Sequence, residues 1–82
     1  MRIRDILNRL RWHPEEDIQD YEITFTHRGA FQDRKTIHAE EIDEILSSYF
    51  TYKEREETVV IPFHRILEIR NRKTGEITWK KR

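Results

Sequence analysis

The chain has 82 residues, of which 35% are apolar and 39% charged, with sixteen acidic and sixteen basic side chains. This is the length of one domain, because two domains would each lack a sufficient core. The absence of cysteine excludes disulfides and thiolate metal sites, and no apolar run approaches the ~20 residues that a transmembrane helix needs. Charged residues interrupt the first apolar positions, so no secretory signal is predicted. We therefore expect a cytoplasmic protein without membrane contact.

The charges are unevenly distributed along the chain. Residues 1–12 hold four arginines and one acid, and residues 58–82 hold seven basic and two acidic side chains. Acids dominate residues 13–26 and 40–57. If the two ends meet in the fold, they form a basic face that the net charge of zero conceals. Eleven of the sixteen basic residues are arginine, which favours bidentate phosphate contacts. The alternative is a solvated, salt-bridged surface of the kind found in thermophilic proteins.

A short helix is the first predicted element. Its apolar stripe has the spacing i, i+3, i+4, i+7 and consists of Ile3, Ile6, Leu7 and Leu10. The face turned away from this stripe carries Arg4, Asn8 and Arg11, which could contact a phosphate or a base or simply face water. The helix should end near Trp12, because the residue before Pro14 is held out of the α region.

The next elements alternate between turns and strands. Residues 14–17 could form one helical turn, with proline first and acids following. Residues 21–27 alternate apolar and polar side chains, which predicts a half-buried strand that ends at His27. Arg28 and Gly29 then begin a turn, and a second strand is predicted over residues 34–38.

A second amphipathic helix is predicted over residues 40–46, because Ile42, Ile45 and Leu46 repeat the helical spacing. The remaining predicted strands cover residues 49–53, 58–63, 66–70 and 76–80. The last two form a hairpin in which Gly75 supplies a positive φ. The sum is an α+β fold: two short helices packed on a mostly antiparallel sheet of five to six strands. A sheet this small could curl into a partial barrel.

The segment from Val59 to Arg70 is the one most suggestive of a site. Its first apolar run is halted by Pro62, which cannot donate to a sheet ladder and therefore marks a strand end, an edge or a bulge. His64 and Arg65 follow, and such a pair beside a strand end could bind an anion on a rigid support. The alternative is that Arg65 is a surface residue and His64 bonds a neighbouring loop.

Several motifs, in the same order, resemble the RNA cyclic-group-end recognition domain family. They are RDILNRLRW (residues 4–12), the strand that begins at Tyr21, the Arg28-Gly29 turn, IPFHRI (residues 61–66) and GEITW (residues 75–79). The resemblance covers nearly the whole chain, so residues 1–82 are interpreted as one domain of this type. This family comprises small, largely archaeal proteins and modules of larger eukaryotic ones. Where many members have an acid before the arginine of the turn, this chain has His27.

The resemblance implies a module that binds RNA ends carrying a phosphate, above all a 2′,3′-cyclic phosphate. It implies RNA and RNA-processing proteins as partners, and neither a cofactor nor an established enzymatic activity. The residues that we expect to contact RNA are His64, Arg65, Arg4, Asn8, Arg11, Arg28 and Trp12. Trp12, Trp79, Phe63 and the tyrosines could stack on unpaired bases, although in so small a chain each is also expected as a core residue.

The histidines and the acidic segments bear on other classes of function. A two-histidine phosphoesterase needs His-x-Ser/Thr twice, and none of the four histidines has that context. An acid–base pair of two histidines that are distant in sequence stays open, because such pairing is spatial. No spacing typical of a metal site is present. A protein-interaction module using the acidic residues 13–22 and 40–57 is the main alternative, and the oligomeric state is not indicated.

Overall fold

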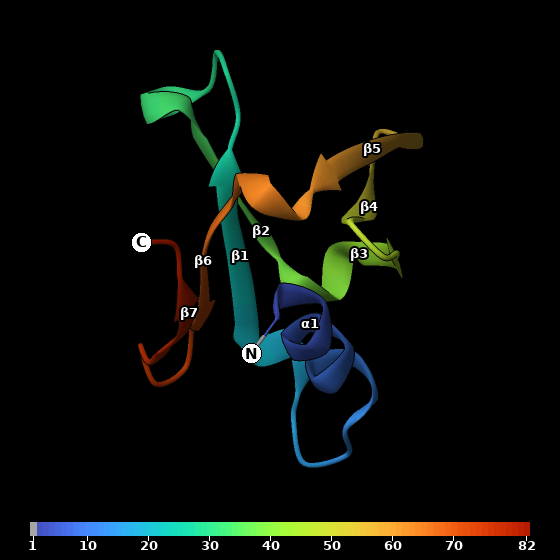
Figure 1. Cartoon of the computed structure of the whole chain (residues 1–82), viewed down its shortest axis with the longest axis vertical. Coiled ribbons are helices and arrows are strands. Elements are labelled where there is room, and N and C mark those ends of the chain that lie inside the picture. The colour runs from blue at the N-terminus through green and yellow to red at the C-terminus, as the bar shows by residue number, and fades with distance from the viewer. Residues whose placement is uncertain (1) are drawn as a thin grey trace.

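The computed structural model describes residues 2–82, over which the chain forms one α-helix, seven strands and four short 3-10 turns (Figure 1). The helix is α1 (Ile3–Trp12). The strands are β1 (Tyr21–Thr26), β2 (Arg34–His38), β3 (Ile42–Ile45), β4 (Tyr49–Glu54), β5 (Glu57–Pro62), β6 (Ile66–Asn71) and β7 (Ile77–Lys80). The 3-10 turns are η1 (Ile18–Asp20), η2 (Phe31–Asp33), η3 (Ala39–Glu41) and η4 (Phe63–Arg65).

The strands form two antiparallel sheets. One has the order β2-β1-β6-β7 and the other the order β3-β4-β5. In the view of Figure 1 the four-stranded sheet lies on the left, the three-stranded sheet on the right, and α1 below and between them. The α+β class and the antiparallel pairing are confirmed. The predicted single sheet of five to six strands is wrong, since there are two sheets, and over residues 2–82 they do not close into a barrel.

The core lies where α1 and the two sheets meet. Ile6, Leu7 and Leu10 are at most 2% exposed, as their helical spacing predicts. Phe25 of β1 and Phe50 of β4 are fully buried and meet edge to face, with ring centroids 6.2 Å apart. This contact joins the two sheets, and edge-to-face aromatic pairs add to the stabilisation from area burial alone.

The helix ends where the sequence predicts. His13 is extended (φ −81°, ψ 123°) because it precedes Pro14, and its N–H still bonds the carbonyl of Arg9 at 2.9 Å. The helical turn predicted for residues 14–17 is wrong. The chain makes a simple turn there. The carboxylate of Asp17 accepts the N–H of Gln19 at 3.0 Å, and the short turn η1 starts at Ile18.

The second predicted helix is also wrong. Residues 39–41 form the turn η3, and the carboxylate of Glu41 accepts the N–H of His38 at 2.7 Å. The chain then continues as strand β3, whose pairing with β4 shifts register between Ile42 and Glu44. Such a bulge adds a residue, so two inward side chains of a strand can stand three apart as on a helix. Ile42 and Ile45 are that pair, and the spacing that indicated a helix arises from a bulged strand.

The segment around Pro62 has the predicted shape. β5 ends at Pro62, η4 reverses the chain, and β6 leaves in extended form and pairs with β1. The hairpin of β6 and β7 is confirmed as well, with Gly75 at φ +80° between the two strands. This geometry places the exposed residues His64 and Arg65 at the junction of the two sheets.

Candidate nucleic-acid interface

One hollow is built from the two ends of the chain. We call it the end hollow. It has a volume of about 720 Å³, within the range typical of small-molecule sites. It is lined by Arg2, Ile3, Arg4, Asp5, Ser47, Phe63, His64, Trp79 and Lys81. These residues come from the start of α1, the β3–β4 turn, η4 and the end of β7, so segments distant in sequence form one concave surface.

Packing and hydrogen bonds hold the walls of the end hollow. Phe63 and Trp79 are half-buried against the core and also line the hollow. The N–H of Phe63 donates to the carbonyl of Ser48 at 3.0 Å. Lys81 donates twice, from its backbone to the carbonyl of Leu67 at 2.8 Å and from Nζ to the carbonyl of His64 at 2.6 Å. Lys81 is thereby bonded to η4 and to the start of β6, and Phe63 and Trp79 line the same hollow as the cationic side chains.

The end hollow is electropositive. Arg2, Arg4 and Lys81 carry positive charge, and Asp5 is the one acid of the lining. Among residues 2–82, none of the ion pairs involves these three cations. α1 begins at Ile3, and the first N–H groups of a helix have no partner within it, so the helix dipole adds to the positive potential.

A second, smaller hollow also takes a residue from η4. It has a volume of about 350 Å³ and is lined by Thr26, Arg28 and Arg65, and we call it the arginine hollow. A 3-10 turn has three residues per turn, so neighbouring side chains point about 120° apart. For this reason His64 faces the end hollow while Arg65, the next residue, faces the arginine hollow. The predicted histidine–arginine pair is therefore divided between two hollows.

The remaining predicted residues lie along α1. Asn8 and Trp12 line a shallow third hollow of about 420 Å³. The guanidinium carbon of Arg11 lies 5.3 Å from the centre of the Trp12 ring, and this tryptophan is 73% exposed. Arg4 is at the other end of the helix, about 10 Å from Arg11 along the axis by helix geometry. The face Arg4, Asn8 and Arg11 thus does not converge on one point.

Arg2, Ser47 and Lys81 line the end hollow but were not among the predicted contact residues. Ser47 carries no signal that sequence reasoning could have used. The two cations were indicated only as a group, because the basic character of both chain ends predicted a shared face.

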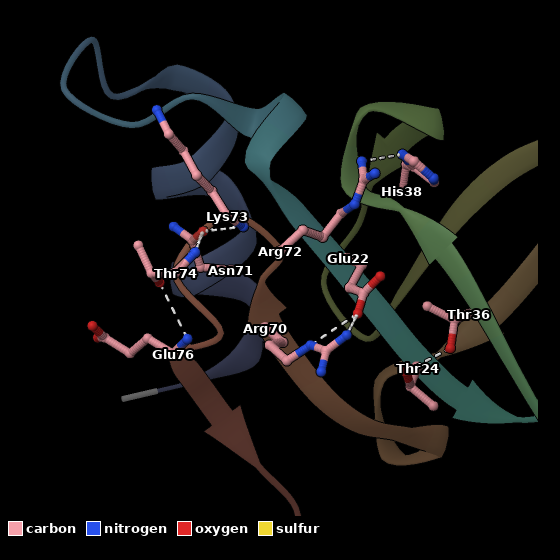
Figure 2. A network of polar contacts seen from close by, with 10 residues as sticks. All are labelled: Glu22, Thr24, Thr36, His38, Arg70, Asn71, Arg72, Lys73, Thr74 and Glu76. Carbon is pink, nitrogen blue, oxygen red and sulfur yellow. Dashed lines mark hydrogen bonds and ion pairs between the residues drawn. The ribbon is translucent and has the colours of Figure 1, made fainter.

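The outer face of the four-stranded sheet is polar, and some of its side chains pair with one another (Figure 2). Arg70 of β6 donates from Nε to the carboxylate of Glu22 at 2.9 Å and forms a second bond through Nη2. Thr24 and Thr36 share a hydrogen bond of 2.8 Å between β1 and β2. Beyond β6, Nη1 of Arg72 lies 2.8 Å from Nδ1 of His38. Arg34 of β2 and Lys80 of β7 belong to none of the ion pairs in residues 2–82, and they line a further hollow of about 200 Å³.

The groups with shifted pKa values lie outside both hollows. Nζ of Lys35 lies 2.8 Å from each carboxylate oxygen of Glu54, which raises the pKa of Lys35 and lowers that of Glu54. Burial raises the pKa of Tyr52 and of Tyr21, and the hydroxyl of Tyr21 donates to Glu16 at 2.7 Å. These contacts connect strands and loops, and we interpret them as structural.

The positions of the histidines bear on acid–base chemistry. His64 is the one histidine in residues 2–82 that lines the end hollow. His27 stands edge to face with Phe25, with ring centres 6.3 Å apart, and His38 contacts Arg72. The described part of the chain contains no group of three metal-ligating side chains and no helix with the length and apolarity of a membrane span.

A small antiparallel α+β domain with a cationic, aromatic-lined hollow between its chain ends is thus the class that the structure defines. Residues 1–81 match the family model described as the MJ1316 RNA cyclic group end recognition domain, and the chain belongs to this family. The resemblance seen in the sequence motifs is confirmed.

The similar proteins are archaeal. The chain is 42% identical to UPF0248 protein MJ1316 of Methanocaldococcus jannaschii over 80 residues, which cover 98% of this chain and 94% of that one. It is 46% identical to a UPF0248 protein of Methanococcus vannielii, with 96% and 90% covered. A relative from Saccharolobus islandicus is 36% identical, with 99% and 100% covered. No solved structure matches the chain.

Proposed function

We propose that the chain binds the phosphate-bearing 3′ end of an RNA strand, with the terminal phosphate in the end hollow. The observation that carries this proposal is the combination, in one concave surface, of Arg2, Arg4 and Lys81 with the rings of Phe63 and Trp79. Guanidinium groups bind phosphate oxygens, and aromatic faces stack on unpaired bases. The name of the family, RNA cyclic group end recognition domain, supports the same function.

A 2′,3′-cyclic phosphate is the end group that we propose as the preferred ligand. It has two non-bridging oxygens that can face cations and lies at the end of a ribose whose base is free to stack. In the proposed complex Arg4 and Lys81 contact the phosphate, His64 adds a ring nitrogen at the rim, and Trp79 or Phe63 supports the base. The role is binding, and RNA-processing proteins are the partners that would use an end held in this way.

The test compares short RNAs that are identical except for their 3′ ends: 2′,3′-cyclic phosphate, linear 3′-phosphate and 3′-hydroxyl. Fluorescence anisotropy with a label at the 5′ end measures each affinity. A hydrogen bond to a charged group contributes about 1.5–3 kcal/mol, so the 3′-hydroxyl RNA should bind roughly 10- to 150-fold more weakly. Arg4→Gln should reduce the affinity for phosphate ends by a similar factor and remove most of the difference between ends.

Arg55→Gln is the matched control. Arg55 is an exposed arginine of the β4–β5 turn, outside both hollows, and its loss should leave the affinity unchanged. Arg4 is exposed, so Arg4→Gln should also keep the melting temperature of the parent protein. Equal affinities for the three ends, unaffected by Arg4→Gln, would refute the proposal and favour a protein-interaction module.

A further inference from the structure

The β1–β2 loop presents a large aromatic side chain to solvent. Phe31 is 87% exposed, although phenylalanine is among the residues most often buried. It stands in the loop that extends beyond the body of the molecule in Figure 1, coloured cyan to green. No described residue covers its ring, and none of the functions considered above uses it.

This loop is held in one shape. The N–H of His27 donates to the carbonyl of Asp33 at 2.8 Å, and the N–H of Asp33 donates to the carbonyl of Ala30 at 2.9 Å. The carboxylate of Asp33 accepts the N–H of Gly29 at 3.2 Å. Gln32 and Asp33 both have positive φ, 57° and 55°, which non-glycine residues adopt only where the surroundings impose it. Phe31 is therefore presented by an ordered loop.

Unpaired guanidinium groups lie near the base of the same loop. Arg28 and Arg65 line the arginine hollow with Thr26, and none of the ion pairs in residues 2–82 involves either arginine. Arg34 stands opposite Thr26 in the β1–β2 register and adds a third cation. An exposed ring on a loop whose base carries unpaired arginines is a combination with which proteins bind single-stranded nucleic acid.

The end hollow and the arginine hollow each take a residue from the turn η4. Consecutive Cα atoms are 3.8 Å apart, and the neighbours His64 and Arg65 face one hollow each. The turn η4 that carries them lies beside the upper end of β1 in Figure 1, where Phe25 and Ile66 pair. A strand whose terminal phosphate occupies the end hollow can thus continue past η4 toward the β1–β2 loop.

We propose that this loop is a second nucleotide site: Arg28 and Arg65 hold a backbone phosphate upstream of the RNA end, and Phe31 stacks on an unpaired base. The inference rests on the proposed function, because it takes the ligand to be an RNA strand end. It adds that the protein binds a single-stranded segment of several nucleotides and reaches beyond the terminal one.

A length series tests the second site. Ligands with the same 3′-terminal phosphate are a mononucleotide, a dinucleotide, a tetranucleotide and a hexanucleotide. Base stacking on one aromatic side chain changes affinity by about 5- to 150-fold. Affinity should rise by this order as the chain lengthens, and Phe31→Ala should remove the rise while leaving the affinity for the mononucleotide unchanged. The double variant Arg28→Gln/Arg65→Gln should flatten the series in the same way.

A hexanucleotide with one abasic position gives a second measurement. If the missing base is the one that stacks on Phe31, its removal and Phe31→Ala should each weaken binding, and the two together should weaken it no further. Ile77→Ala, which truncates another exposed apolar side chain, is the matched control and should change nothing. Phe31→Ala should keep the parent melting temperature, because Phe31 is 87% exposed and has little packing to lose.

The outcomes separate the two proposals. A flat length series with an intact preference for phosphate ends would overturn the second site alone, and so would a Phe31→Ala effect that is equal for mononucleotide and hexanucleotide. Absence of binding to every ligand, at low salt, would refute the proposed function and the second site with it.

Discussion

Salt provides a quantitative test of the cationic surface. Arg2, Arg4 and Lys81 line the end hollow, and Arg28 and Arg65 line the arginine hollow. Binding of single strands releases about 0.7 counterions per neutralised phosphate. If each hollow takes one phosphate, the slope of log K against log salt concentration is about −1.4, and if each of the five cations takes one, it is about −3.5. Affinity should therefore fall by about 7- to 130-fold between 50 and 200 mM salt.

Fluorescence anisotropy with a phosphate-ended hexanucleotide, titrated at four or more KCl concentrations, measures this slope. Arg28→Gln/Arg65→Gln should make it shallower by at least about 0.7, the amount for one lost phosphate contact. Arg55→Gln removes a charge outside both hollows and should not change it. A slope near zero, or one that responds equally to both changes, would show that these hollows do not hold the phosphates.

Two further predictions concern stability, and urea titration measures both. The ammonium of Lys35 lowers the pKa of Glu54 in the folded protein, so as the pH falls this carboxyl is protonated in the unfolded chain before it is protonated in the folded one. The free energy of unfolding should therefore decrease as the pH falls below about 4.5. Lys35→Met should weaken this dependence, and an unchanged profile would contradict the assignment. Phe50→Ala should lower the free energy of unfolding by about 3–5 kcal/mol, because the ring is fully buried between the sheets. Val60→Ala, on the exposed side of β5, should change it by less than about 1 kcal/mol. Similar losses for both variants would contradict the assignment of Phe50 to the core.

Most of the strands could be predicted from the sequence because their cause is local. Alternating burial at Tyr21, Ile23 and Phe25 follows from the geometry of a strand with one face inward. Pro62 and Gly75 mark a strand end and a turn through their own backbone restrictions. Such signals need no knowledge of distant parts of the chain.

The helix predicted for residues 40–46 shows where local patterns fail. The separation of Ile42 and Ile45 by three residues fits both a helix and a bulged strand, and the choice depends on the pairing of β3 with β4. That pairing includes a bond of 3.2 Å from the N–H of Glu44 to the hydroxyl of Thr51, a residue seven positions away. Tertiary contacts therefore outweighed the helical spacing.

The candidate site could be predicted only in part for the same reason. The uneven charge indicated that the chain ends share a basic face, and the end hollow does bring cations from both ends together. The different directions of His64 and Arg65 depend on the 3-10 conformation of η4, and the high exposure of Trp12 depends on which elements pack against α1. Neither is encoded in the spacing of the residues themselves.

The position of the end hollow between Arg2 and Lys81 has a practical consequence. An affinity tag or a fluorescent fusion attached at either end of this chain would emerge near the rim of the hollow and could compete with the proposed RNA ligand. The β4–β5 turn is a better place for a label, since none of its described residues lines either hollow. By the same geometry, a domain joined to either end would begin next to the end hollow and could receive a ligand from it without a long linker.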